Sequence, residues 1–240
     1  MKKPNTIPSR ILLPNMITIA GLCAGLTAIR FAFQGNMEMA FFAVLVAAVC
    51  DGLDGTVARA VKGTSQFGVE LDSLADMVSF GVAPAFMLYM WVLSDVPRFG
   101  WAVCLLYVVC SALRLARFNV DDSSPKPIKK AYFTGVPMPM AAYLVLSPLM
   151  LLKGAEDHFF AQPNLVMMVV IAVSALMVSK IPTFSPKSIK LPFWFALPAF
   201  LGVALAAAFM LTDPWLTLAG IGGIYVLLLP VSYYVALKRP

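Results

Sequence analysis

The sequence alternates long apolar runs with short polar segments from one end to the other. A run of about 20 apolar residues crosses a hydrocarbon core of about 30 Å as an α-helix, which rises about 1.5 Å per residue. The pattern therefore predicts an all-α, polytopic membrane helical bundle with about eight transmembrane helices in one domain. The predicted spans are residues 13–33, 39–60, 69–93, 99–118, 134–152, 165–179, 191–211 and 215–237.

Two of the predicted connections, residues 121–130 and 180–190, are polar and basic. The fifth span, which follows the first of these loops, opens with Pro137 and Pro139. Proline has no backbone N–H to donate within a helix. We therefore expect these two prolines to break or bend the first turn of that span.

The composition agrees with a membrane protein, because 60% of the residues are hydrophobic and 12% are charged. The net charge of +6 could suggest nucleic-acid binding. That function requires a basic face on a folded soluble domain, whereas the basic residues here lie between apolar spans. The sequence therefore predicts the lipid bilayer as a partner and no nucleic acid.

The positions of the basic residues also predict the orientation, because lysine and arginine accumulate in cytoplasmic loops. With eight spans, both termini and the loops after the second, fourth and sixth spans lie on one side. All but three of the 18 basic residues fall on that side, and the exceptions are Arg30, Arg98 and Lys153. Both termini are therefore predicted to be cytoplasmic.

Four aspartates lie in the second and third predicted spans, near their cytoplasmic ends. Asp51 and Asp54 are three residues apart and Asp72 and Asp76 are four apart, so each pair shares one helix face. A charged residue inside a span costs about 2.5–3.5 kcal/mol on insertion scales, so these carboxylates require compensation. Carboxylate oxygens without histidine or cysteine favour Mg²⁺ or Mn²⁺ over zinc.

The residues that follow the first aspartate pair suit a phosphate ligand. Gly55 and Ala58 allow close approach to the backbone, and Arg59 offers a guanidinium for phosphate recognition. Two divalent ions held close together would suit displacement at phosphorus. Intramembrane carboxylates also line cation pathways, so a cation transporter is an alternative of a different class.

Together these residues form the pattern D-x2-D-G-x2-A-R-x8-G-x3-D-x3-D, which resembles the motif of the CDP-alcohol phosphotransferases. In that family a hydroxyl attacks a CDP-linked lipid or alcohol and CMP leaves. Membrane prenyltransferases also use aspartates to bind a pyrophosphate through metal, but they lack DGxxAR. The pattern is matched by Asp51, Asp54, Gly55, Ala58, Arg59, Gly68, Asp72 and Asp76.

The resemblance covers about residues 10–190, which implies a catalytic core at 1–190 and two additional C-terminal helices at 191–238. It also implies a multi-pass protein of the cell (inner) membrane with its active site at the cytoplasmic face. Members of the family often form dimers, which implies a homodimer, although no span here carries a clear interface signal.

The resemblance further implies the roles of the site residues. Two divalent ions, Mg²⁺ or Mn²⁺, would be held by Asp51, Asp54, Asp72 and Asp76, and Asp76 would also be the general base. The donor, CDP-diacylglycerol, would be bound by Asn15, Thr18, Gly55, Ala58, Arg59, Ser65 and Gly68.

Outside the motif, the runs SALRLARFNV and YFTGVPMP and the eight spans resemble the branch of the family that uses L-serine as the acceptor. Serine brings a carboxylate, which Arg114 or Arg117 could bind, and Asn119 is a weaker candidate. The two arginines are equally consistent with ordinary anchors on the cytoplasmic side. Glycerol 3-phosphate, inositol or its phosphate, and choline are the alternative acceptors.

Overall fold

The computed structural model describes residues 9–61, 63, 65–96, 98–122, 132–179, 182–184 and 196–237. Within these residues the chain is helical apart from one pair of three-residue strands. It divides into two compact units, Met1–Arg117 and Phe118–Pro240. The predicted all-α architecture is therefore confirmed, with one small antiparallel pair added.

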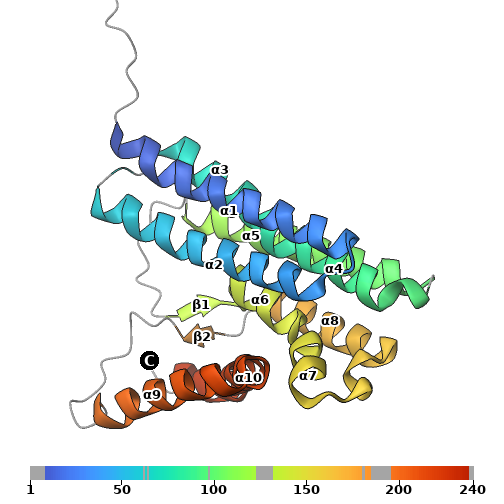
Figure 1. Ribbon diagram of the computed structural model, residues 1–240. Helices are drawn as coiled ribbons and strands as arrows, with labels where there is room; N and C mark the ends of the chain where they lie inside the picture. Colours follow the sequence, from blue (N-terminus) through green and yellow to red (C-terminus); the bar gives the residue numbers. More distant parts are fainter. Residues whose placement is uncertain are drawn as a thin grey trace, which may run out of the picture. The chain divides into compact units, whose positions relative to one another are not determined.

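The first unit contains helices that run alongside one another (Figure 1), and α1 packs against α2, α3 and α4. Asn36 caps α2 by accepting a hydrogen bond from the Met39 amide, and Ser65 caps α3 by accepting one from the Gly68 amide. The elements are α1 Ser9–Phe33, α2 Met37–Ala60, α3 Gln66–Asp76, the π-helix η1 Met77–Val82, α4 Ala83–Trp91, the 3₁₀-helix η2 Leu93–Asp95, and α5 Gly100–Asp122, which continues into the second unit.

The second unit contains shorter helices and the strand pair, in which β1 and β2 are antiparallel with Phe133 opposite Thr183. Both strands lie in segments for which the hydrophobic pattern predicts no strand. The elements are β1 Tyr132–Thr134, α6 Met138–Val145, α7 Ser147–Ala155, the 3₁₀-helix η3 His158–Ala161, α8 Pro163–Val178, β2 Pro182–Phe184, α9 Ala196–Thr212 and α10 Pro214–Leu237.

Each of the eight predicted spans corresponds to a helix, a broken helix or a bent helix pair in the described residues. Four helical stretches are long and apolar enough to cross a membrane, and α6 with α7 is a fifth candidate if the bent pair is one span. Three further apolar helices are shorter: Pro163–Val178, Phe200–Thr212 and Pro214–Pro230. The protein is therefore membrane-embedded, with four or five candidate spans by length and composition.

The first turn of the predicted fifth span is not helical, as Pro137 and Pro139 led us to expect, because α6 begins only at Met138. Pro137 has an extended backbone and caps α6, and Pro139 lies in the first turn, where a missing amide costs no intrahelical hydrogen bond. A further bend of 43°, which the sequence pattern does not predict, lies between α6 and α7. Pro148 follows this break, and a proline there cannot donate to the preceding turn.

The third span is continuous from Gln66 to Trp91, but it contains the π-helical turn η1 directly after Asp76. The apolar pattern of this span does not predict that turn. A π-turn holds more residues per turn than an α-helix and changes the direction of the side chains that follow.

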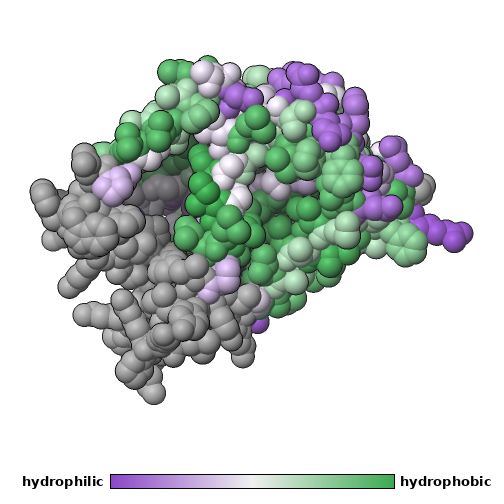
Figure 2. All heavy atoms as spheres, turned by 90° about the horizontal axis from the view of Figure 1, so that it is seen from below, coloured by the Kyte–Doolittle hydropathy of each residue, from purple (hydrophilic) through white to green (hydrophobic). Residues whose placement is uncertain are grey.

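Large hydrophobic side chains are exposed on many helices, including Leu74, Trp101, Phe200 and Leu211. Figure 2 shows that hydrophobic residues form broad areas of the described surface, while hydrophilic residues gather separately. In water such a surface would drive aggregation, whereas in a bilayer it contacts lipid tails. The exposed side chains therefore agree with a membrane-embedded protein.

Gly25 of α1 packs directly against Ser79 of η1. A Cβ atom on Gly25 would lie 2.7 Å from the Ser79 Cα and 2.8 Å from its Cβ. The Ser79 hydroxyl also donates to the Gly21 carbonyl at 3.3 Å. Glycine at position 25 therefore allows α1 to approach the π-helical turn closely.

We expect Gly25→Ala to destabilise the protein by about 1–3 kcal/mol, because the added methyl group overpacks this contact. The measurement is the midpoint of thermal unfolding of purified protein in detergent. Gly220→Ala is the control, since a Cβ there meets no atom within 4 Å. Equal loss of stability in both variants would contradict this account of the contact.

Candidate functional site

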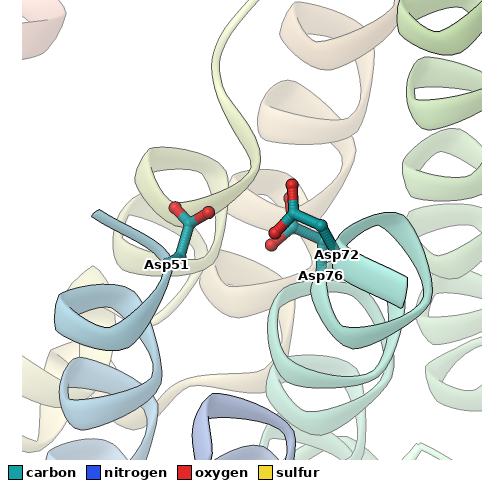
Figure 3. A group of neighbouring side chains, drawn as sticks. All are labelled: Asp51, Asp72 and Asp76. Carbon is teal, nitrogen blue, oxygen red and sulfur yellow. The ribbon is translucent and has the colours of Figure 1, made fainter. Parts of the chain in front are cut away.

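Three of the four motif aspartates form a compact carboxylate cluster. One oxygen from each of Asp51, Asp72 and Asp76 lies within 4.8 Å of the others. Figure 3 shows Asp51 on α2 facing Asp72 and Asp76, which lie together on α3. The second predicted pair thus faces Asp51 of the first pair, and the grouped oxygens suit a hard divalent cation.

The fourth aspartate, Asp54, has a separate partner on α1. The Thr18 hydroxyl lies 2.6 Å from Asp54 Oδ2 and 3.2 Å from the Pro14 carbonyl of its own helix. Both side chains are buried, with 6% of their surface exposed. Because α1 packs against α2, Thr18 can hold the Asp54 carboxylate in a fixed orientation.

All four aspartates line one small cavity, called here the aspartate cavity. Asp54 thus belongs to the same site as the cluster, although it is not one of its three grouped members. The remaining lining residues come from α1, α2, α3 and η1, and they are Thr18, Gly21, Ala47, Ala75, Ser79 and Phe80.

A second, larger cavity of about 180 Å³ is called here the nucleotide cavity, after the ligand that the sequence resemblance implies for its residues. It contains every residue that the sequence resemblance assigns to the donor, although these residues come from α1, α2, the connection after α2, and α3. Its lining residues are Pro14, Asn15, Thr18, Asp54, Gly55, Ala58, Arg59, Gly63, Ser65, Gly68, Val69 and Asp72.

Gly68 has a physical role in the nucleotide cavity. A Cβ atom there would lie 2.9 Å from Asn15 Oδ1 and 3.1 Å from Ser65 Oγ. The same Ser65 oxygen accepts a hydrogen bond from the Gly68 amide at 3.0 Å. Glycine therefore lets Asn15 and the cap of α3 come together at the cavity wall.

Arg59 lies at the end of α2 and reaches back along the helix. Its Nη2 donates to the Thr56 hydroxyl at 3.2 Å. A Cβ on Gly55 would lie 3.6 Å from Arg59 Nη1, so the guanidinium lies over the glycine. The nucleotide cavity thus has a positive group above an open stretch of backbone, as recognition of a phosphate requires.

The two cavities share Thr18, Asp54 and Asp72 as lining residues. A ligand held in the nucleotide cavity therefore lies against Asp54 and Asp72, two of the four carboxylates that line the aspartate cavity. This arrangement suits a nucleotide whose phosphates extend toward bound cations.

The three candidate acceptor residues differ in their surroundings. Arg114 on α5 is partly buried and lies close enough to Asp51 and Asp76 to interact with their charges. Arg117 is exposed and lines neither cavity. Asn119 belongs to the second unit. The structure therefore brings Arg114 to the aspartates.

Sequence reasoning missed several lining residues of both cavities. Some of them could have been identified from helical spacing, since residues three or four positions from a motif residue share its helix face. Pro14 and Gly21 flank Thr18 in this way, Ala47 precedes Asp51, and Ser79 follows Asp76. Phe80 also follows Asp76, by four positions, whereas Gly63 lies in the connection after α2, where helix spacing does not apply.

Comparison with protein families gives two matches. The model described as CDP-alcohol phosphatidyltransferase matches residues 11–181, which include the four aspartates and every residue of both cavities. A second model, described as CDP-alcohol phosphatidyltransferase 2, matches residues 195–230.

Curated relatives agree with this match. The chain is 39% identical over 207 residues to the CDP-diacylglycerol–serine O-phosphatidyltransferase of Mycobacterium leprae, an alignment that covers 85% of this chain and 69% of that protein. It is 35% identical over 218 residues to the enzyme of the same name from Helicobacter pylori, covering 90% and 88%. It is 36% identical over 183 residues to the archaetidylserine synthase of Methanothermobacter thermautotrophicus, covering 75% and 73%. With a family model that matches most of its length and relatives above 30% identity, the chain belongs to the CDP-alcohol phosphatidyltransferase family.

Proposed function

We propose that the protein transfers the phosphatidyl group of CDP-diacylglycerol to the hydroxyl of L-serine, giving phosphatidylserine and CMP. The observation that carries this proposal is the junction of the two cavities, since the nucleotide cavity shares Thr18, Asp54 and Asp72 with the aspartate cavity. The serine acceptor is supported by the M. leprae and H. pylori relatives, which are named for it.

In this proposal the nucleotide cavity holds the CDP part of the donor. Arg59 binds a phosphate oxygen, and the missing side chain of Gly55 leaves room for the ligand beside the guanidinium. Asn15 and Ser65 face the same cavity and can bind polar groups of the nucleotide. The diphosphate then lies at the shared wall, beside Asp54 and Asp72.

The family uses divalent metal ions, and the carboxylates of this chain fit such ions. We propose that Asp51, Asp54, Asp72 and Asp76 hold two of them, Mg²⁺ or Mn²⁺, with all-oxygen ligation. When bound, such ions neutralise the diphosphate and stabilise the charge on the departing CMP.

Asp76 is the general base in this proposal. It lies in the cluster with Asp51 and Asp72 but does not line the nucleotide cavity in the described residues. The serine oxygen attacks the phosphorus that carries the diacylglycerol, the bond from that phosphorus to the oxygen of CMP breaks, and CMP leaves with the electron pair. Asp76 takes the proton of the serine hydroxyl.

Arg114 is the acceptor-binding residue in this proposal. This assignment is supported by the charge of Arg114, which acts on both Asp51 and Asp76. A guanidinium binds a carboxylate through two parallel hydrogen bonds, as the carboxylate of serine requires. A phosphorylated acceptor would require several converging cations instead.

We further propose eight transmembrane spans with both termini in the cytoplasm, in the cell (inner) membrane. The bias of basic residues toward one side supports this orientation. It places the site near the cytoplasmic boundary, where soluble serine and CMP meet a lipid whose tails stay in the bilayer.

The division into a catalytic core at 1–190 and two added helices at 191–238 is supported by family matches that end at 181 and resume at 195. The homodimer stays a prediction.

A cation transporter accounts for less of the structure. It would use the aspartates, but it would leave Arg59 and the glycines of the nucleotide cavity without a role. The family match and the named relatives favour group transfer as well.

The acceptor is tested by incubating purified protein with CDP-diacylglycerol, Mn²⁺ or Mg²⁺, and one acceptor at a time. We expect L-serine to release more CMP than glycerol 3-phosphate, myo-inositol or choline. If serine releases no more CMP than a reaction without acceptor, the serine assignment fails. Ion flux in vesicles without CMP formation with any acceptor would favour the transporter.

We expect Asp76→Asn to lower kcat by about 10²–10⁴-fold, because the amide cannot accept the proton of the hydroxyl. The measurement is CMP release at saturating serine, with the elution volume and thermal midpoint of the variant as checks on folding. Glu70→Gln is a matched control, since Glu70 is an exposed carboxylate on the same helix and lines neither cavity. Full activity in Asp76→Asn would remove Asp76 as the base.

We expect Thr18→Val to weaken Mn²⁺ binding by about tenfold or more, because the Asp54 carboxylate loses the hydroxyl that orients it. The measurement is a Mn²⁺ titration followed by electron paramagnetic resonance, and Thr18→Ser should retain the wild-type affinity. Thr27→Val is the control, since Thr27 lies on the same helix and donates to the Cys23 carbonyl at 2.6 Å. An unchanged affinity in Thr18→Val would show that Thr18 does not position a metal ligand.

A further inference from the structure

We propose that Tyr107 is a positioning residue for Asp76 and Arg114, acting through the π-helical turn η1. The inference rests on the proposed function, because it assigns the reaction's base to Asp76. Its structural basis is a hydrogen bond in which the Tyr107 hydroxyl donates to the Phe80 carbonyl at 2.8 Å.

The π-turn begins immediately after Asp76, the last residue of α3. Its residues Ser79 and Phe80 line the aspartate cavity together with Asp76 itself. A π-turn departs from the regular α-helical pattern of hydrogen bonds and is less favourable than an α-helical turn, so it persists where its surroundings hold it. Any loosening of this turn would therefore move the residue that directly precedes it.

Helix α5 holds the π-turn from one side. Tyr107 is fully buried, and the Ser111 hydroxyl donates to the Tyr107 carbonyl at 2.8 Å. One turn earlier on α5, the Cys104 thiol contacts the Ala85 carbonyl at 3.4 Å. A Cβ on Gly81 would lie 3.2 Å from the Ser111 Cβ, so α5 passes close to the turn at this glycine.

Arg114 continues the same face of α5. The residues at 104, 107, 111 and 114 are separated by three, four and three positions, which places them on one helix face. Along this face, Cys104 meets Ala85, Tyr107 meets Phe80, Ser111 meets Gly81, and Arg114 interacts with Asp76. The hydrogen bond of Tyr107 thus lies on the same helix face as Arg114, whose charge acts on Asp76.

Helix α1 holds the π-turn from another side, through the hydrogen bond from Ser79 to the Gly21 carbonyl and the close packing of Gly25. The turn is therefore held between α1 and α5. Among the described residues, no member of η1 lines the nucleotide cavity. The contact of Tyr107 should thus affect the base and the metal site without changing recognition of the nucleotide.

The test is Tyr107→Phe, which removes one hydroxyl and keeps the ring. We expect kcat for CMP release to fall about ten- to hundredfold, because small displacements of a reacting group have effects of this size. The KM for CDP-diacylglycerol should stay within about twofold of wild type, because the nucleotide cavity is unchanged. The Kd for Mn²⁺, measured by electron paramagnetic resonance, should rise, since Asp76 belongs to the carboxylate cluster.

Tyr143→Phe is the matched control. The Tyr143 hydroxyl also donates to a backbone carbonyl, that of Leu218, but it lies in the second unit, which contains none of the four aspartates. We expect wild-type kcat and Mn²⁺ affinity in this variant. If Tyr143→Phe lowers both as much as Tyr107→Phe does, the effect is general loosening of the bundle and the inference is overturned.

A second variant tests the same contact by adding bulk. Gly81→Ala should lower kcat and leave the KM for CDP-diacylglycerol unchanged, because its methyl group presses against Ser111. Adding Ser111→Gly in the same chain should restore most of the lost kcat.

Wild-type kcat and Mn²⁺ affinity in Tyr107→Phe would overturn the inference. If the wild-type protein releases no CMP with any acceptor, the proposed function fails, and the Mn²⁺ comparison still decides whether Tyr107 positions Asp76.

Discussion

The cost of keeping four carboxylates within apolar helices constrains much of the first unit. Each of them must be met by a cation, a hydrogen-bond donor or a bound ion, since the surrounding hydrocarbon offers none. The structure provides Thr18 for Asp54 and the charge of Arg114 for Asp51 and Asp76. The cluster itself supplies a site where divalent cations can complete the compensation.

The carboxylates reach these partners only if the helices approach one another closely, and small residues allow this approach. Gly25 lets α1 come against the π-turn, and Gly81 lets α5 come against it from another side. Gly68 brings Asn15 to the cap of α3. Of these three glycines, Gly68 also lines the nucleotide cavity.

The aspartate pairs and the nucleotide cavity could be predicted from the sequence because their residues are set by helix phase and by a dense local motif. The seven residues that the resemblance assigns to the donor come from α1, α2, the connection after α2, and α3, and all of them line one cavity. The π-turn could not be predicted, because no apolar pattern distinguishes it from a continuous helix. The contact of Tyr107 with Phe80 could not be predicted either, since 27 residues separate them and the bond uses a backbone carbonyl. The bend between α6 and α7 could not be predicted, because Pro148 in the first turn of α7 looks in sequence like Pro139 in the first turn of α6.

The small strand pair of the second unit has a consequence for the path of the chain. β1 directly precedes α6, and β2 follows α8, so their pairing joins the two ends of this helical segment. Gly135, with φ of +79°, packs against the Met177 carbonyl of α8 at the same end of this helical segment. Two hydrogen-bonded strands occupy one side of a bilayer, so the chain between them crosses an even number of times. The bent pair α6–α7 and the short helix α8 therefore either both cross the membrane or both stay on one side of it.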